Sequence, residues 1–226
     1  MSSYSGRNGL WIVAFGFALL LPNVVAAAEE FEDASIILEH NATDGDYEIV
    51  IEATGADTGI VEFSVKSPSG SLIATIKMEE PGGREFLIES PEPTDLQGIL
   101  DAFPEGDYAF TARTLDGETL ETTAALAHAL APATTITAPT GDEPVPANAG
   151  VIEWKSVPLA TRYSVEIEND GLDFTLLVHL PSDATRFAVP AGVLMPDTEY
   201  ELGVMAAMES GNITVVETSF TTSAKP

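Results

Sequence analysis

The stretch Val151-Ile-Glu-Trp-Lys-Ser-Val-Pro-Leu-Ala-Thr-Arg-Tyr163 decides the fold of this chain. Its pattern predicts two β-strands joined by a turn that contains proline. Side chains alternate between the two faces of a strand, so Ile152 and Trp154 share a face of the first strand. Tyr163 and Ile167 share a face of the second strand in the same way. A strand pair with large apolar residues on one face predicts a sheet that is packed on one side only.

The region after residue 131 carries several more strands of this kind. The seven strands that the sequence predicts there lie at 134–138, 150–155, 161–169, 172–180, 184–189, 198–208 and 212–222. Seven short strands separated by turn signals are typical of an immunoglobulin-like β-sandwich. The core Trp154, the Tyr163 that opens the third strand, the corner Leu194–Tyr200 and the final Thr218–Thr222 resemble the fibronectin type III family. There is no Arg-Gly-Asp, so the integrin-binding motif of some members does not carry over.

The preceding region has the same alternating character. Apolar residues alternate with polar ones over 47–53 and 61–65, and Asp116-Gly117 is a strong hairpin signal. The spacing of Leu96, Ile99 and Phe103 predicts one short helix over 94–103, with Thr94 as its N-cap. The segments 103–108 and 113–117 resemble an immunoglobulin-like companion domain found ahead of fibronectin type III modules in exported bacterial proteins. The predicted fold class is therefore all-β, with two tandem β-sandwiches and one short helix in the first.

The first 28 residues have the three-part pattern of a secretory signal peptide. Arg7 precedes an uncharged apolar run from Leu10 to Leu21, and Ala26-Ala-Ala28 supplies small residues for cleavage. A membrane-spanning helix would need about 20 apolar residues, which is longer than this run. The predicted organisation is a cleaved signal peptide at 1–28, an N-terminal β-sandwich at 29–131 and a fibronectin type III-like domain at 132–226. A secreted or periplasmic location follows, without membrane insertion of the mature chain.

The chain is strongly acidic, with 9 Lys and Arg against 36 Asp and Glu. Removal of residues 1–28 takes away only Arg7, so the mature charge is 8 − 36 = −28. Such a chain repels phosphate backbones, which excludes nucleic acid as a partner class. The acidity favours solvation of a dispersed protein, and the alternative is the binding of cations, calcium above all.

Few residues suggest chemistry. There is no cysteine, no nucleophile elbow, no phosphate-binding loop and no zinc motif, so neither a catalytic residue nor a cofactor is predicted. The strongest metal candidate is the turn with Asn41, Asp44 and Asp46, because calcium prefers oxygen ligands. The same residues also explain a turn without any metal. Asn41-Ala-Thr43 and Asn212-Ile-Thr214 match the glycosylation acceptor pattern, and in a bacterial protein they are better interpreted as turn residues.

The sequence thus predicts a non-enzymatic binding or spacer protein that acts on another protein at the cell exterior or in the periplasm. Loops or a sheet edge would supply its binding surface. An accessory carbohydrate- or calcium-binding protein is the alternative. A carbohydrate site would need exposed aromatic rings, and the one Trp of the mature chain is assigned to the core. A third possibility, an enzyme, would require two carboxyl groups facing each other in a cleft, about 5 to 10 Å apart in a glycosidase.

Overall fold

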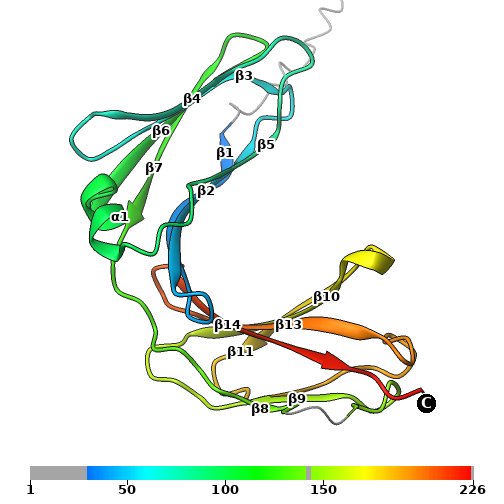
Figure 1. Ribbon diagram of the computed structural model, residues 1–226. Coiled ribbons are helices and arrows are strands. Elements are labelled where there is room, and N and C mark those ends of the chain that lie inside the picture. Colours follow the sequence, from blue (N-terminus) through cyan, green and yellow to red (C-terminus); the bar gives the residue numbers. More distant parts are fainter. Residues whose placement is uncertain (1–29, 141–143, 225–226) are drawn as a thin grey trace, which may run out of the picture.

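The computed structural model describes residues 30–140 and 144–224, and Figure 1 shows two β-sandwiches set at an angle to each other. The predicted signal peptide lies outside the described residues. Strands make up most of the described chain, with one short α-helix in the first sandwich, so the predicted fold class is confirmed. Within the described ranges, no helix is both long enough and apolar enough to cross a membrane.

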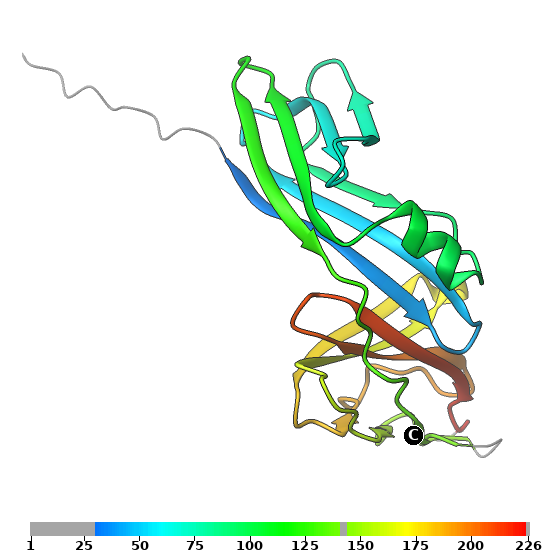
Figure 2. The same ribbon diagram turned by 90° about the vertical axis from the view of Figure 1, so that its left-hand side faces the viewer.

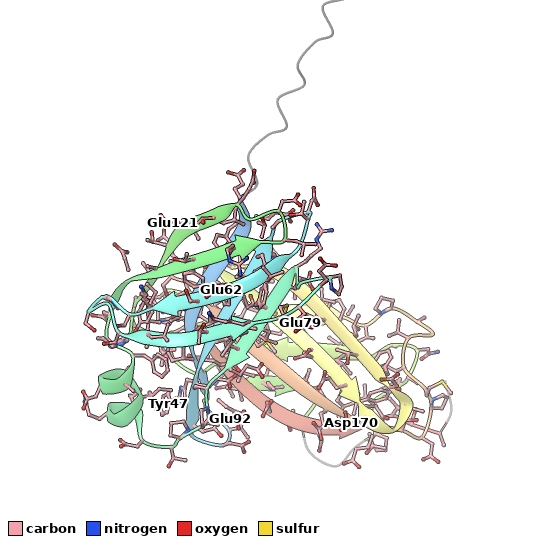
Figure 3. All side chains as sticks on the ribbon, turned by 90° about the horizontal axis from the view of Figure 1, so that it is seen from above. Tyr47, Glu62, Glu79, Glu92, Glu121 and Asp170 are labelled. Carbon is pink, nitrogen blue, oxygen red and sulfur yellow. The ribbon has the colours of Figure 1, made fainter. Side chains whose placement is uncertain are left out.

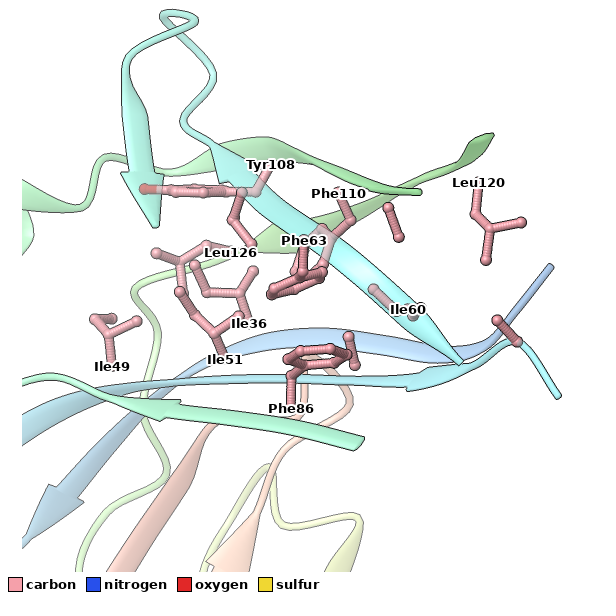
Figure 4. Packing of buried hydrophobic residues seen from close by; sticks show 14 of the residues in the cluster. Ile36, Ile49, Ile51, Ile60, Phe63, Phe86, Tyr108, Phe110, Leu120 and Leu126 are labelled. Carbon is pink, nitrogen blue, oxygen red and sulfur yellow. The ribbon is translucent and has the colours of Figure 1, made fainter. Parts of the chain in front are cut away.

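The first sandwich packs a three-stranded layer against a four-stranded sheet. The three-stranded layer consists of β1 (Phe31–Asn41), β2 (Asp46–Gly55) and β5 (Glu85–Glu89). The facing sheet has the order β4 (Leu72–Lys77), β3 (Ile60–Lys66), β6 (Gly106–Thr114) and β7 (Thr119–Leu126). Aromatic side chains from both layers fill the space between them, as Figure 4 shows. The rings of Phe63 and Phe86 stack with their centroids 4.7 Å apart.

The helix α1 spans Leu96–Ala102 and buries Ile99 against the first sandwich. The sequence predicted this helix, but its start was placed wrongly. The N-cap residue is Asp95 rather than Thr94, and no side chain caps the helix end. Pro91 and Pro93 lie before the helix in a segment without regular secondary structure, and a residue that precedes a proline is disfavoured in helical conformation. Packing of Ile99, rather than capping, therefore decides where this helix forms.

The second sandwich also has a three-stranded and a four-stranded layer. The first layer consists of β8 (Ile136–Ala138), β9 (Val151–Trp154) and β12 (Arg186–Ala188). The second has the order β11 (Phe174–Pro181), β10 (Arg162–Asn169), β13 (Glu199–Ala207) and β14 (Ile213–Thr221), with the short 3-10 helix η1 (Asp170–Leu172) between β10 and β11. Trp154 is 3% exposed and its ring lies 5.6 Å from that of Tyr163. Its assignment to the core is confirmed.

Buried tyrosines fasten loops to this second core. The Tyr200 hydroxyl accepts a hydrogen bond from the backbone N–H of Met195 at 2.9 Å, and the side chain is 1% exposed. We expect Tyr200→Phe to lower the free energy of unfolding by about 1–3 kcal/mol, because the Met195 N–H loses its acceptor. Urea titration of both proteins measures this loss. Tyr47→Phe is the matched control, since the half-buried Tyr47 ring stacks on His40, and an equal loss in both variants would contradict the assignment.

The two sandwiches share one sheet. Its order is β11-β10-β13-β14-β1-β2-β5, so β14 of the second sandwich lies beside β1 of the first. Figure 2 shows β1 running from the first sandwich down to β14. The sequence predicted two tandem sandwiches, and it gave no sign of this continuity. Two sheets that were expected to end at the domain boundary instead form one surface of seven strands.

Candidate functional site

The joint between the sandwiches is the first candidate feature. We define it as β1 residues 39–41, β14 residues 213–215 and the connecting segment 127–131. Here β1 and β14 run parallel, with Glu39 opposite Ile213 and Asn41 opposite Val215. The backbone N–H of Ala42 extends the ladder by donating to the Val215 carbonyl at 2.9 Å. Main-chain hydrogen bonds therefore cross directly from one sandwich to the other.

Asn212 completes the joint from inside. The side chain has 0% exposure, and its Oδ1 accepts a hydrogen bond from the Leu38 N–H at 3.0 Å. Its Nδ2 donates to the carbonyls of Ala127 at 2.7 Å and Ala129 at 2.8 Å. One side chain thus ties β1, the connecting segment and the start of β14 together. Thr214, also at 0% exposure, adds a 2.7 Å bond from its hydroxyl to the Ala131 carbonyl.

The turn that follows β1 closes the other side of the joint. Asn41 Nδ2 donates to a carboxylate oxygen of Glu217 at 2.8 Å, and the Glu217 N–H donates to the Thr43 hydroxyl at 2.7 Å. The asparagines of both glycosylation acceptor patterns, Asn41 and Asn212, therefore each bond to the other sandwich beside the joint. Asn212 has no exposed amide and uses both of its amide hydrogens in hydrogen bonds, so the folded chain offers no site for glycosylation at this residue. The interpretation of both asparagines as turn residues missed their role between the sandwiches.

The shared sheet has an outer face that points away from both cores, and Figure 1 shows it on the concave side of the molecule. Alternation along the strands places many carboxylates on this side. We call them the acidic face: Glu39, Glu48, Glu89, Glu166, Glu168, Glu201 and Glu217. Arg162 is the only Lys or Arg in the seven strands of the sheet.

Acidic side chains also cover the rest of the molecule, for example Glu62 and Glu121 in Figure 3. The acidic face differs from the other surfaces in that its carboxylates form no ion pairs with Lys or Arg among the described residues. Ion pairs among the described residues join Lys77 and Arg113 to Glu62, Arg84 to Asp57, and Arg186 to Glu153, all outside the acidic face. Like charges on the acidic face are therefore left to repel one another.

Glu39 lies at the centre of this repulsion. Burial, followed by the charges of Glu48, Glu217, Glu166 and Glu89, raises the pKa of its carboxyl to about 7. Two of these neighbours belong to the first sandwich and two to the second. The charge of Glu39 therefore opposes the approach of the two sandwiches at the joint.

Two other members of the acidic face respond in the same way. Burial and the nearby charges of Glu168 and Glu217 raise the pKa of Glu166. Burial and the charges of Glu89, Glu92 and Asp46 raise the pKa of Glu48. Carboxylate repulsion thus extends over strands of both sandwiches.

A hollow of about 350 Å³ lies on the acidic face. It opens where Gly203 has no side chain, between Glu166 on β10 and Glu217 on β14. Glu168 and Glu201 also line it. The lining residues include no aromatic, His, Lys or Arg side chain. The hollow gathers carboxylates on an open sheet face, without the aromatic platform that a sugar ring requires.

In the predicted calcium turn, the side-chain oxygen of Asn41 is engaged in other bonds. Asn41 Oδ1 accepts hydrogen bonds from the backbone N–H groups of Thr43 at 3.0 Å and Asp44 at 3.2 Å. This arrangement is an Asx turn, which needs no metal. Across residues 30–140 and 144–224, no group of three or more His, Asp or Glu side chains is arranged to hold a metal ion.

We therefore expect calcium and magnesium to raise the melting temperature equally at matched ionic strength, since both screen the acidic face in the same way. Thermal unfolding with each cation and with chelator measures this. A calcium-specific rise of several degrees that Asp44→Asn abolishes would contradict this prediction and restore the calcium turn.

The histidines are separate from one another. His128 follows the end of β7, and its ring Nε2 lies 2.7 Å from the Phe103 carbonyl oxygen. The partly exposed His40 lies near the end of β1, and its ring stacks on that of Tyr47 with the centroids 4.4 Å apart. His179 is exposed on β11, with its Nδ1 2.8 Å from the Ser164 hydroxyl.

No protein-family model and no curated protein sequence matches the chain. Among solved structures, a two-domain fibronectin type III segment of chicken tenascin is similar over 85% of this chain and 99% of its own length, with 11% identity and a TM-score of 0.33. A bacterial ice-binding adhesin is similar over 84% of this chain and 64% of its own length, with 16% identity and a TM-score of 0.30. A tandem repeat from the extending region of a large adhesion protein is similar over 85% of this chain and 50% of its own length, with 10% identity and a TM-score of 0.29.

Proposed function

We propose that this chain is an exported, non-enzymatic spacer that holds two β-sandwiches in one fixed arrangement and presents their surfaces to another protein. The proposal places it at the cell exterior or in the periplasm, after removal of residues 1–28. Its two units would be 29–131 and 132–226, with the connecting segment 127–131 docked on the second.

The joint is the observation that carries the proposal. Domains linked by a small interface normally move relative to each other. Here the β1–β14 ladder and the buried Asn212 replace a mobile linker with hydrogen bonds that are shielded from water. A buried polar group that loses its partner costs free energy, so bending at the joint is opposed. A spacer needs this resistance, because its task is to keep two surfaces at a set separation.

The hollow supports a non-enzymatic role. A glycosidase needs one carboxyl group that donates a proton and a second that acts on the sugar, within a site that also holds the substrate. The hollow supplies carboxylates from Asp44, Glu166, Glu168, Glu201 and Glu217, but no aromatic side chain lines it. Substrate pockets are usually deep and mostly apolar, with a few placed polar groups.

Three measurements on the native cell and the purified protein test the proposal together. Fractionation should find the protein outside the cytoplasm, and its intact mass should correspond to a chain that begins at Glu29. Small-angle scattering of this protein should fit one conformer in which the joint is formed. A cytoplasmic protein of full mass would contradict the export, and scattering that requires many interdomain angles would contradict the spacer role.

A further inference from the structure

The shared sheet ends on one side at β11, which is an open edge strand. Among the described residues, β10 is the only strand paired with β11. Figure 3 shows the β10–β11 hairpin at the margin of the second sandwich, with Asp170 near its tip. The backbone groups on the outer side of β11 are therefore available to another strand.

β11 lacks the features that normally protect an edge. Proteins guard edge strands with charged residues, prolines, bulges or short length. The β11 sequence Phe174-Thr-Leu-Leu-Val-His-Leu-Pro181 has no Asp, Glu, Lys or Arg over 8 residues, its pairing with β10 shows no bulge, and its proline comes last. Leu177 in its middle is 48% exposed.

The other edge strands are guarded. β5 has a glutamate at each end, β4 carries Lys77, and β7 carries Glu121. The edges of the small sheet, β8 and β12, are only 3 residues long. In a chain with a net charge of −27, an eight-residue edge without charged side chains is therefore distinct from every other edge in the described structure.

The sequence of β11 is also complementary to itself. An antiparallel pair of two copies centred on Leu177 sets Leu177 opposite its own copy. It sets Thr175 opposite His179 on the outer face. On the core face, Leu176 lies opposite Val178. Apolar residues thus meet apolar residues, polar residues meet polar ones, and no like charges lie directly opposite, which is the arrangement that stabilises cross-strand pairs.

We propose that a second copy of this chain pairs with the first through the two β11 edges, antiparallel and centred on Leu177. The contact is isologous, since the same surface is used on both copies, and it closes a dimer rather than a filament. The two seven-stranded sheets become one continuous sheet across both molecules. The spacer role of a single chain does not depend on this pairing.

The acidic face sets the conditions for the dimer. Two copies, each with a net charge of −27, repel each other over long distances. The carboxylates near the seam are Asp173, which directly precedes β11, and Glu166 and Glu168 on β10, one strand removed from β11. Salt screens repulsion across such separations, with a Debye length of about 10 Å at 0.1 M. Dimerisation should therefore strengthen as ionic strength rises.

Sedimentation equilibrium of the purified protein, over a range of concentration and salt, tests the proposal. We expect a monomer–dimer equilibrium that shifts toward dimer with added salt. Leu177→Lys should weaken the association at least tenfold, because two lysines then lie directly opposite. Leu87→Lys is the matched control, since Leu87 is 59% exposed on β5 at the other end of the same sheet.

Disulfide trapping tests the register, and the absence of native cysteine leaves each variant with a single thiol. Leu177→Cys should form a covalent dimer, because the two copies of residue 177 face each other. Thr175→Cys should not, since its two copies lie four residues apart, about 14 Å at about 3.4 Å per residue. A protein that stays monomeric in high salt, an equal effect of Leu87→Lys, or trapping by Thr175→Cys would overturn the proposal.

Discussion

Replacing Asn212 by alanine is expected to lower the free energy of unfolding by about 3–5 kcal/mol. The substitution leaves the Leu38 N–H and the carbonyls of Ala127 and Ala129 without their bonds to this side chain. Each buried group without a partner costs about 1–3 kcal/mol. Part of this cost is recovered if water enters the loosened joint, so the total falls below the sum of the three.

The same variant should also separate the unfolding of the two sandwiches. Trp154 reports on the second core alone, while circular dichroism reports on the strands of both. We expect coincident urea transitions by the two methods for the original protein, because the shared sheet couples the sandwiches. For Asn212→Ala we expect the transitions to separate. Asn148→Ala, at an exposed asparagine before β9, is the control, and a loss below 1 kcal/mol for Asn212→Ala would refute the role of the joint.

Replacing Glu39 by glutamine is expected to stabilise the protein at alkaline pH and to leave it unchanged at acidic pH. The pKa of Glu39 is raised from 4.5 to about 7, so the folded state favours the protonated carboxyl. This contribution to stability is fully present below pH 4.5 and is lost as the pH rises through about 7. Glutamine is neutral at every pH, so the Glu39→Gln variant keeps this contribution to stability.

The gain should reach about 2–3 kcal/mol at pH 9, since one pKa unit corresponds to about 1.4 kcal/mol and solvent screens part of the shift. Urea titrations of both proteins at pH 4.5 and pH 9, at matched ionic strength, measure it. Glu121→Gln, at an exposed glutamate on β7, is the matched control. If Glu39→Gln is no more stable than the original protein at pH 9, repulsion at the joint does not lower the stability of the folded protein at that pH.

Much of the fold could be predicted because its signals are local. Alternation around Trp154 and Tyr163 gave strands with a packed face, and Asp116-Gly117 gave a hairpin, because one residue spacing or one turn is enough to define each. β1 begins at Phe31, and its first residues include Glu32 and Asp33, which are not typical of the start of a strand. Phe31 and Asp33 pair with β2, and Glu32 lies at an irregularity between them.

The joint could not be predicted from the sequence. The contact between β1 and β14 connects residues more than 170 positions apart, such as Leu38 and Asn212. An asparagine between Gly211 and Ile213 has the pattern of a turn, and only the docked connecting segment buries it. The sequence predicted strands that are packed on one side only, and it assigned the acidic residues to solvation. The solvent-facing sides of the two sandwiches join into one acidic face because of the joint, which no local pattern predicts.

The central claim is that the joint holds the two sandwiches in one arrangement. Because the native chain has no cysteine, spin labels can be placed at Asp116→Cys in the first sandwich and Asp183→Cys in the second. The distance between them, measured by pulsed electron paramagnetic resonance, tests the claim most directly. We predict one narrow distance distribution, which broadens when Asn212→Ala is added. A broad distribution in the doubly labelled protein with Asn212 intact would contradict the claim.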